Sequence, residues 1–195
     1  EINRKEYLLE KKREGKKIFG VFPGYYPKEL FWAFDILPIE IWDPKVEISY
    51  SNSHLQPYIC SVVKAGLDYI LQEKNDIFDG FLFPHTCDSI QNLATLVADM
   101  IKSPVPVYFF YHPKAPYNEN SKIFYTDEIL HLVQNLEKQF GKVNEKRLTE
   151  AVNMAVSIHS QINLLYEKRN LKKSTLTNKE FYSELRKAEF LAPPD

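Results

Sequence analysis

The sequence lacks the features that define several classes of protein. Its 195 residues include only 2 cysteines, too few for a disulfide scaffold. A formal net charge of -1, with no basic stripe interleaved with aromatic residues, argues against nucleic acid as a partner. No apolar run approaches the roughly 18–20 residues that span a bilayer, and the amino-terminal segment EINRKEYLLEKKREGKK is charged rather than signal-like. We therefore expect a cytoplasmic protein with no nucleic-acid or membrane partner.

The composition predicts a chain that folds around one substantial core. It is 44% hydrophobic and 26% charged, which lies in the ordinary range for globular domains and argues against disorder. A chain of this length accommodates one α/β domain with a helical annex, but not two full-sized domains.

The first part of the chain alternates between two hydrophobic periods. Short apolar runs bounded by Gly or Pro are typical of buried strands, and each is followed by a segment with helical spacing. This alternation predicts a Rossmann-like α/β fold, in which a parallel sheet is flanked by helices. The expected strands cover residues 17–23, 38–42, 78–84 and 105–111, and the expected helices begin near Pro27, Ser51 and Cys87.

The second part of the chain is predicted to be helical. One helix is expected to begin with Thr126 as its cap and to stop at Gly141, a long amphipathic helix to follow, and a last helix to open with the capping-box pair Thr177 and Glu180. We therefore divide the chain into an α/β domain, residues 1–125, which carries both cysteines, and a helical extension, residues 126–195, which packs on it.

The two cysteines are the first candidates for chemistry. In an open parallel sheet, ligands bind beyond the carboxyl ends of the strands, and Cys60 and Cys87 both fall at such ends, close to predicted helix starts. Unpaired N–H groups at a helix start favour a negatively charged sulfur, which is the form that binds metals. Three readings stay open from the residues alone: buried packing thiols, metal or cluster ligands, and a reactive or disulfide-forming pair.

Other polar residues accompany the cysteines. His54 precedes Cys60 and His85 precedes Cys87, so a catalytic Cys–His pair is one interpretation and backbone hydrogen bonding by a strand-end histidine is the other. Glu29 follows the first strand, where an acid serves either the helix dipole or a site. His131 and His159 are expected at the surface. The segment GVFPGYYP lacks the spacing of a nucleotide-binding loop.

Several stretches together resemble a known family. They are GVFPGYYPKELFWAFDILPIEIWDP, SHLQPYICSVVKAGLD, DIFDGFLFPHTCDSIQNLA, INLLYEKRN and FLAPPD. These are similar to the amino-terminal half of the 2-hydroxyacyl-CoA dehydratase and benzoyl-CoA reductase family, especially the dehydratase D-component type. The motifs LQPYICS and FPHTCDSIQN carry the resemblance.

The resemblance implies an iron–sulfur site. Family subunits hold a [4Fe-4S] cluster through three cysteines, and the first two match Cys60 and Cys87, while the family's acid matches Glu29 and places it near the substrate. His85 is expected to contact the same substrate. In the dehydratases an ATP-dependent activator protein delivers one electron through the cluster, and water leaves a 2-hydroxyacyl-CoA by a radical route.

The chain also departs from the family pattern. The third cysteine belongs to a second domain that these residues do not include. We therefore expect a piece of a longer protein that is inactive alone and that pairs with a second dehydratase subunit. Two alternatives remain: a benzoyl-CoA-reductase-like reductive role, and a cluster-less interaction subunit that pairs with a catalytic partner.

Overall fold

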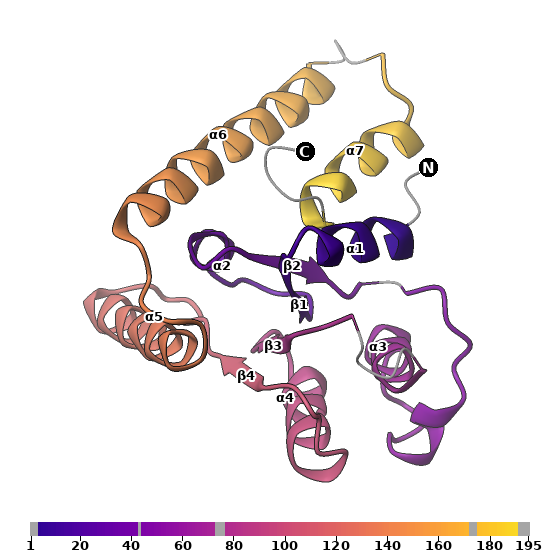
Figure 1. The fold of residues 1–195 in the computed structure, drawn as a ribbon. Helices are drawn as coiled ribbons and strands as arrows, with labels where there is room; N and C mark the ends of the chain where they lie inside the picture. The colour runs from indigo at the N-terminus through magenta and orange to yellow at the C-terminus, as the bar shows by residue number, and fades with distance from the viewer. Residues whose placement is uncertain (1–3, 43, 73–76, 172–174, 191–195) are drawn as a thin grey trace.

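Four parallel strands form the centre of the molecule (Figure 1). The computed structural model describes residues 4–42, 44–72, 77–171 and 175–190. The strands run in the order β2-β1-β3-β4, so the predicted parallel α/β sheet is confirmed. Their bounds are Lys17–Val21 for β1, Ile36–Glu40 for β2, Gly80–Pro84 for β3 and Val107–Phe110 for β4.

The strand order reverses at β1, because β2 lies on one side of it and β3 on the other. In open parallel sheets, ligands bind at such a switch point, beyond the carboxyl ends of the two strands. The residues that follow Val21 and Pro84 therefore occupy the preferred place for a site.

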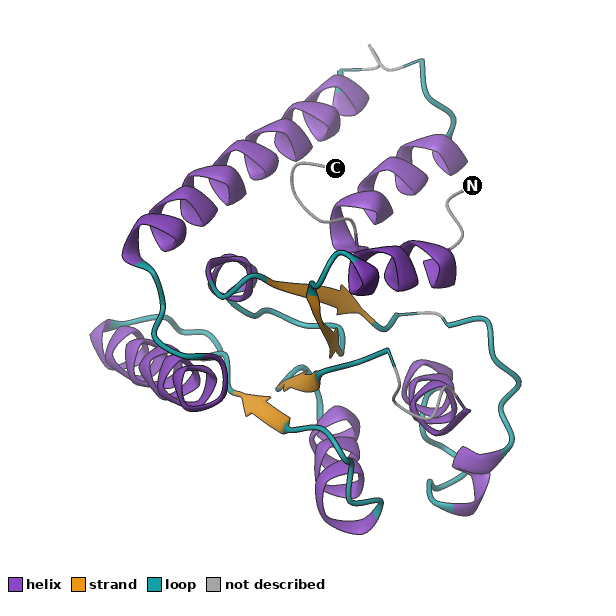
Figure 2. Cartoon of the chain, in the orientation of Figure 1, coloured by secondary structure: helices purple, strands orange, loops and turns teal. Residues whose placement is uncertain are grey.

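Helices cover both faces of the sheet (Figure 2). The α1, α3 and α4 helices contribute to one apolar core, and the α2, α5 and α6 helices to the other. The bounds are Arg4–Arg13 for α1, Lys28–Ala33 for α2, Ser61–Gln72 for α3, Asp88–Thr95 for α4, Glu119–Phe140 for α5, Glu145–Asn170 for α6 and Asn178–Phe190 for α7; the short η1 and η2 helices cover Tyr50–Ser53 and Leu96–Met100.

Successive residues of β1 supply the two cores in turn. Ile18 packs with the α3 and α4 helices, while Phe19 and Val21 pack with the α2 and α5 helices. This alternation is expected, since neighbouring side chains of a strand point to opposite faces. The sheet is therefore buried on both sides, as parallel sheets are.

Glycine and phenylalanine face each other between β1 and β3. Phe19 pairs with Gly80 and Gly20 pairs with Phe81 in the register of these strands. A Cβ added at Gly80 would lie 2.4 Å from the Phe19 ring, and one added at Gly20 would lie 2.8 Å from the Phe81 ring. Each strand thus offers a glycine to the ring of the other.

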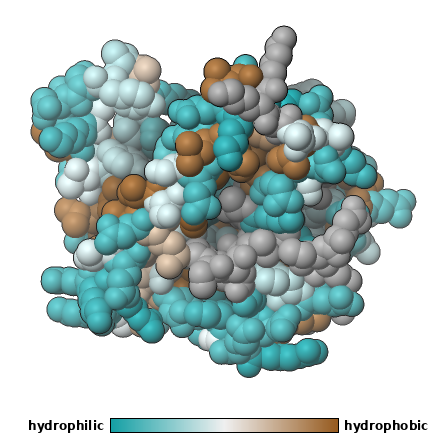
Figure 3. Space-filling view, turned by 90° about the horizontal axis from the view of Figure 1, so that it is seen from above, coloured by the Kyte–Doolittle hydropathy of each residue, from teal (hydrophilic) through white to brown (hydrophobic). Residues whose placement is uncertain are grey.

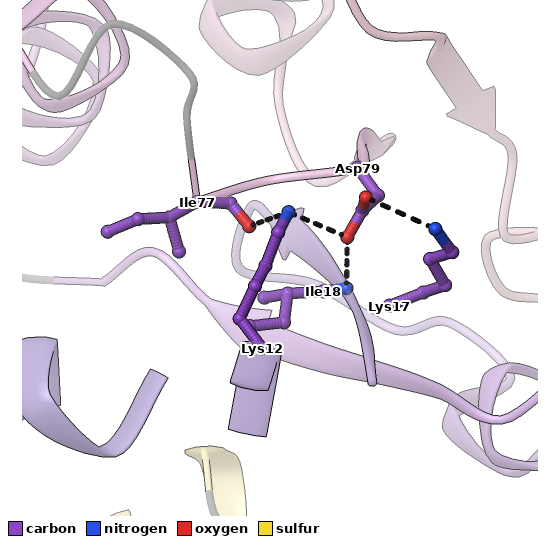
Figure 4. A network of polar contacts seen from close by, with 5 residues as sticks. All are labelled: Lys12, Lys17, Ile18, Ile77 and Asp79. Carbon is purple, nitrogen blue, oxygen red and sulfur yellow. Dashed lines mark hydrogen bonds and ion pairs between the residues drawn. The ribbon is translucent and has the colours of Figure 1, made fainter. Parts of the chain in front are cut away.

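A charged network ties the amino ends of β1 and β3 together (Figure 4). The Asp79 carboxylate accepts a hydrogen bond from the Ile18 backbone N–H at 2.9 Å and lies 3.1 Å from the Lys12 ammonium and 3.8 Å from the Lys17 ammonium. Lys12 also donates to the Ile77 carbonyl at 2.9 Å. This cluster lies at the opposite end of the sheet from the carboxyl edge, and it is structural.

A buried carboxylate anchors the loop that leads to Cys60. Asp68 of α3 is fully buried and accepts hydrogen bonds from the backbone N–H groups of Ser49, Tyr50 and Ser51 at 3.2, 2.8 and 3.1 Å. Burial raises the pKa of this carboxyl, but the hydrogen bonds from Ser51, Ser49 and Tyr50 outweigh it, so the pKa lies below its ordinary value.

The start of α5 differs from the prediction. The helix begins at Glu119, and the Asn118 side chain caps it by accepting from the Ser121 N–H at 3.0 Å. Thr126, the expected cap, lies inside the helix and donates to the Lys122 carbonyl at 2.9 Å. The expected division after residue 125 therefore falls within a continuous helix.

The last two helices agree with the prediction. In the capping box of α7, Thr177 N–H donates to the Glu180 carboxylate at 2.8 Å and Glu180 N–H donates back to the Thr177 hydroxyl at 3.3 Å. His131 and His159 are exposed, as expected. In the described part of α6, only Ala151 is buried.

Viewed from above, the surface is mostly hydrophilic, with apolar residues in smaller patches (Figure 3). Within the described ranges, no helix is both long and apolar enough to cross a bilayer.

Replacing Gly80 with Ala is expected to destabilise the protein by about 1–3 kcal/mol, because the new methyl group overlaps the Phe19 ring. Chemical denaturation measures this change. The pairing also predicts non-additivity: Phe19→Leu in the Gly80→Ala background costs less than Phe19→Leu alone. Strictly additive effects would contradict the proposed ring-over-glycine packing.

Asp68→Asn is expected to lower the free energy of unfolding by about 1–3 kcal/mol near neutral pH, because the loop N–H groups lose a charged acceptor. Since the folded pKa is lowered, the carboxylate stabilises the fold above its unfolded pKa of about 3.9. That stability is lost as the pH falls through the folded pKa.

Denaturation of both proteins at several pH values tests this expectation. The difference between wild type and Asp68→Asn should shrink as the pH falls below about 4, whereas Asp99→Asn, a change at an exposed position, should leave stability unchanged near neutral pH. A difference that stays constant across this range would show that the Asp68 charge contributes nothing.

Candidate functional site

Both cysteines lie directly at helix starts on the carboxyl edge. The Cys60 carbonyl accepts the N–H of Lys64 at 3.2 Å, one turn into α3. Cys87 is the N-cap residue of α4, and its carbonyl accepts the N–H groups of Ile90 and Gln91 at 3.1 and 3.2 Å. The α3 and α4 helices pack on the same face of the sheet and contact each other, so the two thiols share that face.

The two thiols are exposed and unpaired. The reading of Cys60 and Cys87 as buried packing residues is therefore wrong, and no disulfide joins them. The Cys87 side chain also makes no capping hydrogen bond to its helix. Within the described residues, no group of three or more His, Cys, Asp or Glu side chains is arranged to hold a metal ion. The described part of the chain thus offers two exposed thiols but no complete set of metal ligands.

His85 lies between β3 and Cys87. Its backbone N–H donates to the Phe110 carbonyl at 2.8 Å and so prolongs the pairing of β3 with β4. Its ring centroid lies 5.0 Å from that of Tyr111 and 6.0 Å from that of Phe109. The half-buried imidazole therefore stands in an aromatic cluster on the cysteine face. His54, by contrast, is exposed just after η1.

The loops after β1 and β3 are locked together at the switch point. The Thr86 hydroxyl donates to the Pro23 carbonyl at 2.5 Å. A Cβ added at Gly24 would lie 2.3 Å from the Thr86 hydroxyl oxygen and 2.8 Å from the Pro84 Cβ. Only glycine permits this approach of the two loops. The resulting contact of Pro23, Gly24 and Thr86 joins the loops that follow the two central strands.

Glu29 lies on the other face from the cysteines. It is in the first turn of α2, which packs with α5. Burial, followed by the charge of Glu29, raises the pKa of Tyr125 on α5. Tyr125 therefore remains a protonated hydrogen-bond donor at neutral pH beside the carboxylate. The structure brings Cys60, Cys87 and His85 to one face of the edge and Glu29 to the opposite face.

One site residue was missed by the sequence analysis. His112 follows β4, and its ring centroid lies 5.1 Å from Tyr25, 6.1 Å from Tyr117 and 5.3 Å from Tyr125. These rings line a groove of about 680 Å³ on the α5 side of the edge. A signal was present, because His112 is the second residue after β4, as His85 is the first after β3, but the loop that contains His112 has no apolar period.

Comparison with known proteins gives a consistent result. The sequence profile of the family described as 2-hydroxyglutaryl-CoA dehydratase, D-component, matches residues 23–195. The chain is 27% identical over 153 residues to the beta subunit of (R)-2-hydroxyglutaryl-CoA dehydratase from Acidaminococcus fermentans, and the match covers 77% of this chain and 40% of the relative.

Two further relatives have similar coverage. The (R)-phenyllactyl-CoA dehydratase beta subunit of Clostridium sporogenes is 27% identical over 158 residues, with 78% of this chain and 41% of the relative covered. A benzoyl-CoA reductase subunit of Thauera aromatica is 26% identical over 151 residues, with 75% and 37% covered. The chain therefore spans about two-fifths of the length of these relatives. Because the family profile matches nearly the whole chain, the protein belongs to the 2-hydroxyglutaryl-CoA dehydratase D-component family.

Proposed function

We propose that this chain is the first domain of a 2-hydroxyacyl-CoA dehydratase subunit. In the overall reaction, the C2 hydroxyl group and a C3 hydrogen leave as water and a C2–C3 double bond forms, so there is no net oxidation. One observation carries the proposal: in a member of this family, two exposed cysteines stand at helix starts on one face of the ligand-binding edge. Neither thiol packs in a core, although free cysteine is among the most buried residue types.

The two cysteine thiols fit part of an iron–sulfur site. Thiolate sulfur is the ligand that such clusters take, and we assign Cys60 and Cys87 as two ligands of a [4Fe-4S] cluster whose remaining ligands lie outside the described residues. The bound cluster would supply one-electron transfer to the acyl-CoA. The local chain has a separate task, because Asp68 holds the loop before Cys60 and Thr86 holds the loop before Cys87.

Glu29 and His85 are assigned to the substrate. The Glu29 carboxylate lies beside a phenol that stays protonated, so it can accept the proton of a substrate hydroxyl while Tyr125 donates to an oxygen. His85 is held by the rings of Tyr111 and Phe109 and offers a ring nitrogen on the cysteine face. A substrate that meets both residues would reach from one face of the carboxyl edge to the other.

The proposal includes three partners. They are a second dehydratase subunit, which completes the site, an ATP-dependent activator protein that supplies the electron, and an acyl-CoA substrate. The relatives support the first of these partners, because each of them is named as one subunit of its enzyme.

Two other functions each have one supporting observation. A reductive role is favoured by the similarity to a benzoyl-CoA reductase subunit. A cluster-less interaction subunit is favoured because, within the described ranges, no group of three or more His, Cys, Asp or Glu side chains is arranged to hold a metal ion. The iron content of the natural full-length protein separates the second of these from the dehydratase.

Cys60→Ser and Cys87→Ser are each expected to lower the iron and sulfide content of the natural full-length protein, purified anaerobically, because each removes one sulfur ligand. Elemental analysis and visible absorption measure the loss. Ser157→Ala on the exposed side of α6 serves as the control and should keep the wild-type content. Wild-type protein without iron, or cysteine variants with full iron, would overturn the cluster assignment.

Glu29→Gln is expected to lower dehydratase turnover in the reconstituted complex by about 100-fold or more, because the amide cannot accept a proton. Iron content should not change, since Glu29 lies on the opposite face from the cysteines. Glu47→Gln, at an exposed loop position, should retain turnover. If Glu29→Gln keeps wild-type turnover, Glu29 plays no part in proton transfer.

A further inference from the structure

The aromatic groove on the α5 side has the form of a binding site rather than of a core. Its walls are the rings of Tyr25, His112, Tyr117 and Tyr125, and its rim carries Lys122. Tyr25 is 77% exposed and Tyr117 is 66% exposed, so large ring surfaces face solvent. The volume of about 680 Å³ lies within the range of about 300–1,000 Å³ that small-molecule sites occupy.

The rings are held in place from the protein interior. His112 is in contact with the rings of all three tyrosines, at centroid distances of 5.1, 6.1 and 5.3 Å. Tyr125 in turn packs against the fully buried Phe110 ring at 5.9 Å. The groove thus has a fixed back wall and two exposed tyrosines at its mouth, from three different segments of the chain.

The chemistry of these walls favours a flat, aromatic ligand that carries phosphate. Nucleobases stack on tyrosine and histidine rings whatever their hydrogen-bonding pattern. The Lys122 ammonium at the rim provides a point charge for a phosphate, while Glu119, also at the rim, repels a phosphate placed near it and limits where that phosphate lies. Recognition by stacked rings needs no glycine-rich phosphate loop, which this sequence lacks.

We propose that the groove binds the adenine nucleotide end of the CoA thioester, with the adenine ring stacked on the exposed ring of Tyr25, which packs on His112, and a phosphate near Lys122. This assignment rests on the proposed function for the identity of the ligand. The groove and the cysteines share the carboxyl edge but lie on opposite faces of it. The flexible arm of CoA would therefore pass over the contact between Thr86 and Pro23 and present the acyl group on the cysteine face.

Adenosine 3′,5′-bisphosphate is the probe that tests the groove. It contains the nucleotide of CoA but no thiol or acyl group, so its binding does not depend on an iron–sulfur cluster. Calorimetry with the natural full-length protein is expected to show binding. Tyr25→Ala is expected to weaken it about tenfold through loss of the stacking ring, and His112→Ala is expected to weaken it because Tyr25 loses the ring on which it packs. Tyr58→Ala, at an 84% exposed tyrosine next to the cysteine face, should not weaken it.

Further ligands distinguish a site for CoA from a site for ADP or ATP. CoA and the bisphosphate should bind more tightly than ADP or ATP, and Lys122→Gln should reduce that preference. Equal or tighter binding of ATP would overturn the assignment to CoA. If His112→Ala does not fold, saturation transfer from the wild-type protein to the adenine H2 and H8 protons provides the same test.

Failure of this inference is separable from failure of the proposed function. A protein that holds iron and dehydrates its substrate but does not bind the bisphosphate overturns the groove assignment alone. A protein that binds the bisphosphate in the groove but holds no iron overturns the cluster assignment and leaves the groove in place.

Discussion

The reciprocal packing of β1 against β3 is the constraint on which the rest of the structure depends. Phe19 lies over Gly80 on one face of the sheet and Phe81 lies over Gly20 on the other. This arrangement lets two strands that are distant in sequence pair at the point where the strand order reverses. Their carboxyl ends then meet, which allows Thr86 to bond to Pro23 and creates the edge where the candidate site lies.

Because side chains alternate along each strand, the residues at this edge lie on two different faces of the sheet. Residues that follow the inward pattern of Phe83, namely His85, stand on the face of α3 and α4 with the cysteines, whereas residues that follow Phe110, namely His112, stand on the face of α2 and α5 with Glu29. In the register of β3 with β4, His112 lies one residue further along its strand than His85, and because side chains alternate along a strand, the two histidines lie on opposite faces. The candidate site is therefore two-sided, with the two thiols on one face of the edge and the Glu29 carboxylate on the other.

The sequence predicted those features that depend on local patterns. The four strands, the long amphipathic helix and the Thr177–Glu180 capping box all have signals within a few residues. The start of α5 was missed because its first turns, NENSK, are polar and exposed, so no apolar period marks them. Asp68 and His112 were missed for another reason: their roles depend on partners from other elements, such as the N–H groups of Ser49 to Ser51. The exposure of the thiols also follows only from the assembled fold.

The residues that hold the sheet together are different from the residues exposed at its carboxyl edge. The contacts that hold the sheet, at Gly20, Gly80 and Asp79, lie in the interior or at the amino ends of the strands, away from the edge. Cys60, Cys87 and Tyr25 are exposed at the edge, so changing them removes little buried apolar surface. Substitution at the edge can therefore alter the chemistry without unfolding the sheet. This is consistent with a family that includes dehydratases named for different acyl groups and part of a benzoyl-CoA reductase. The exposed loop residues, which the sheet positions but does not need for its own packing, are therefore the residues most free to change between such relatives.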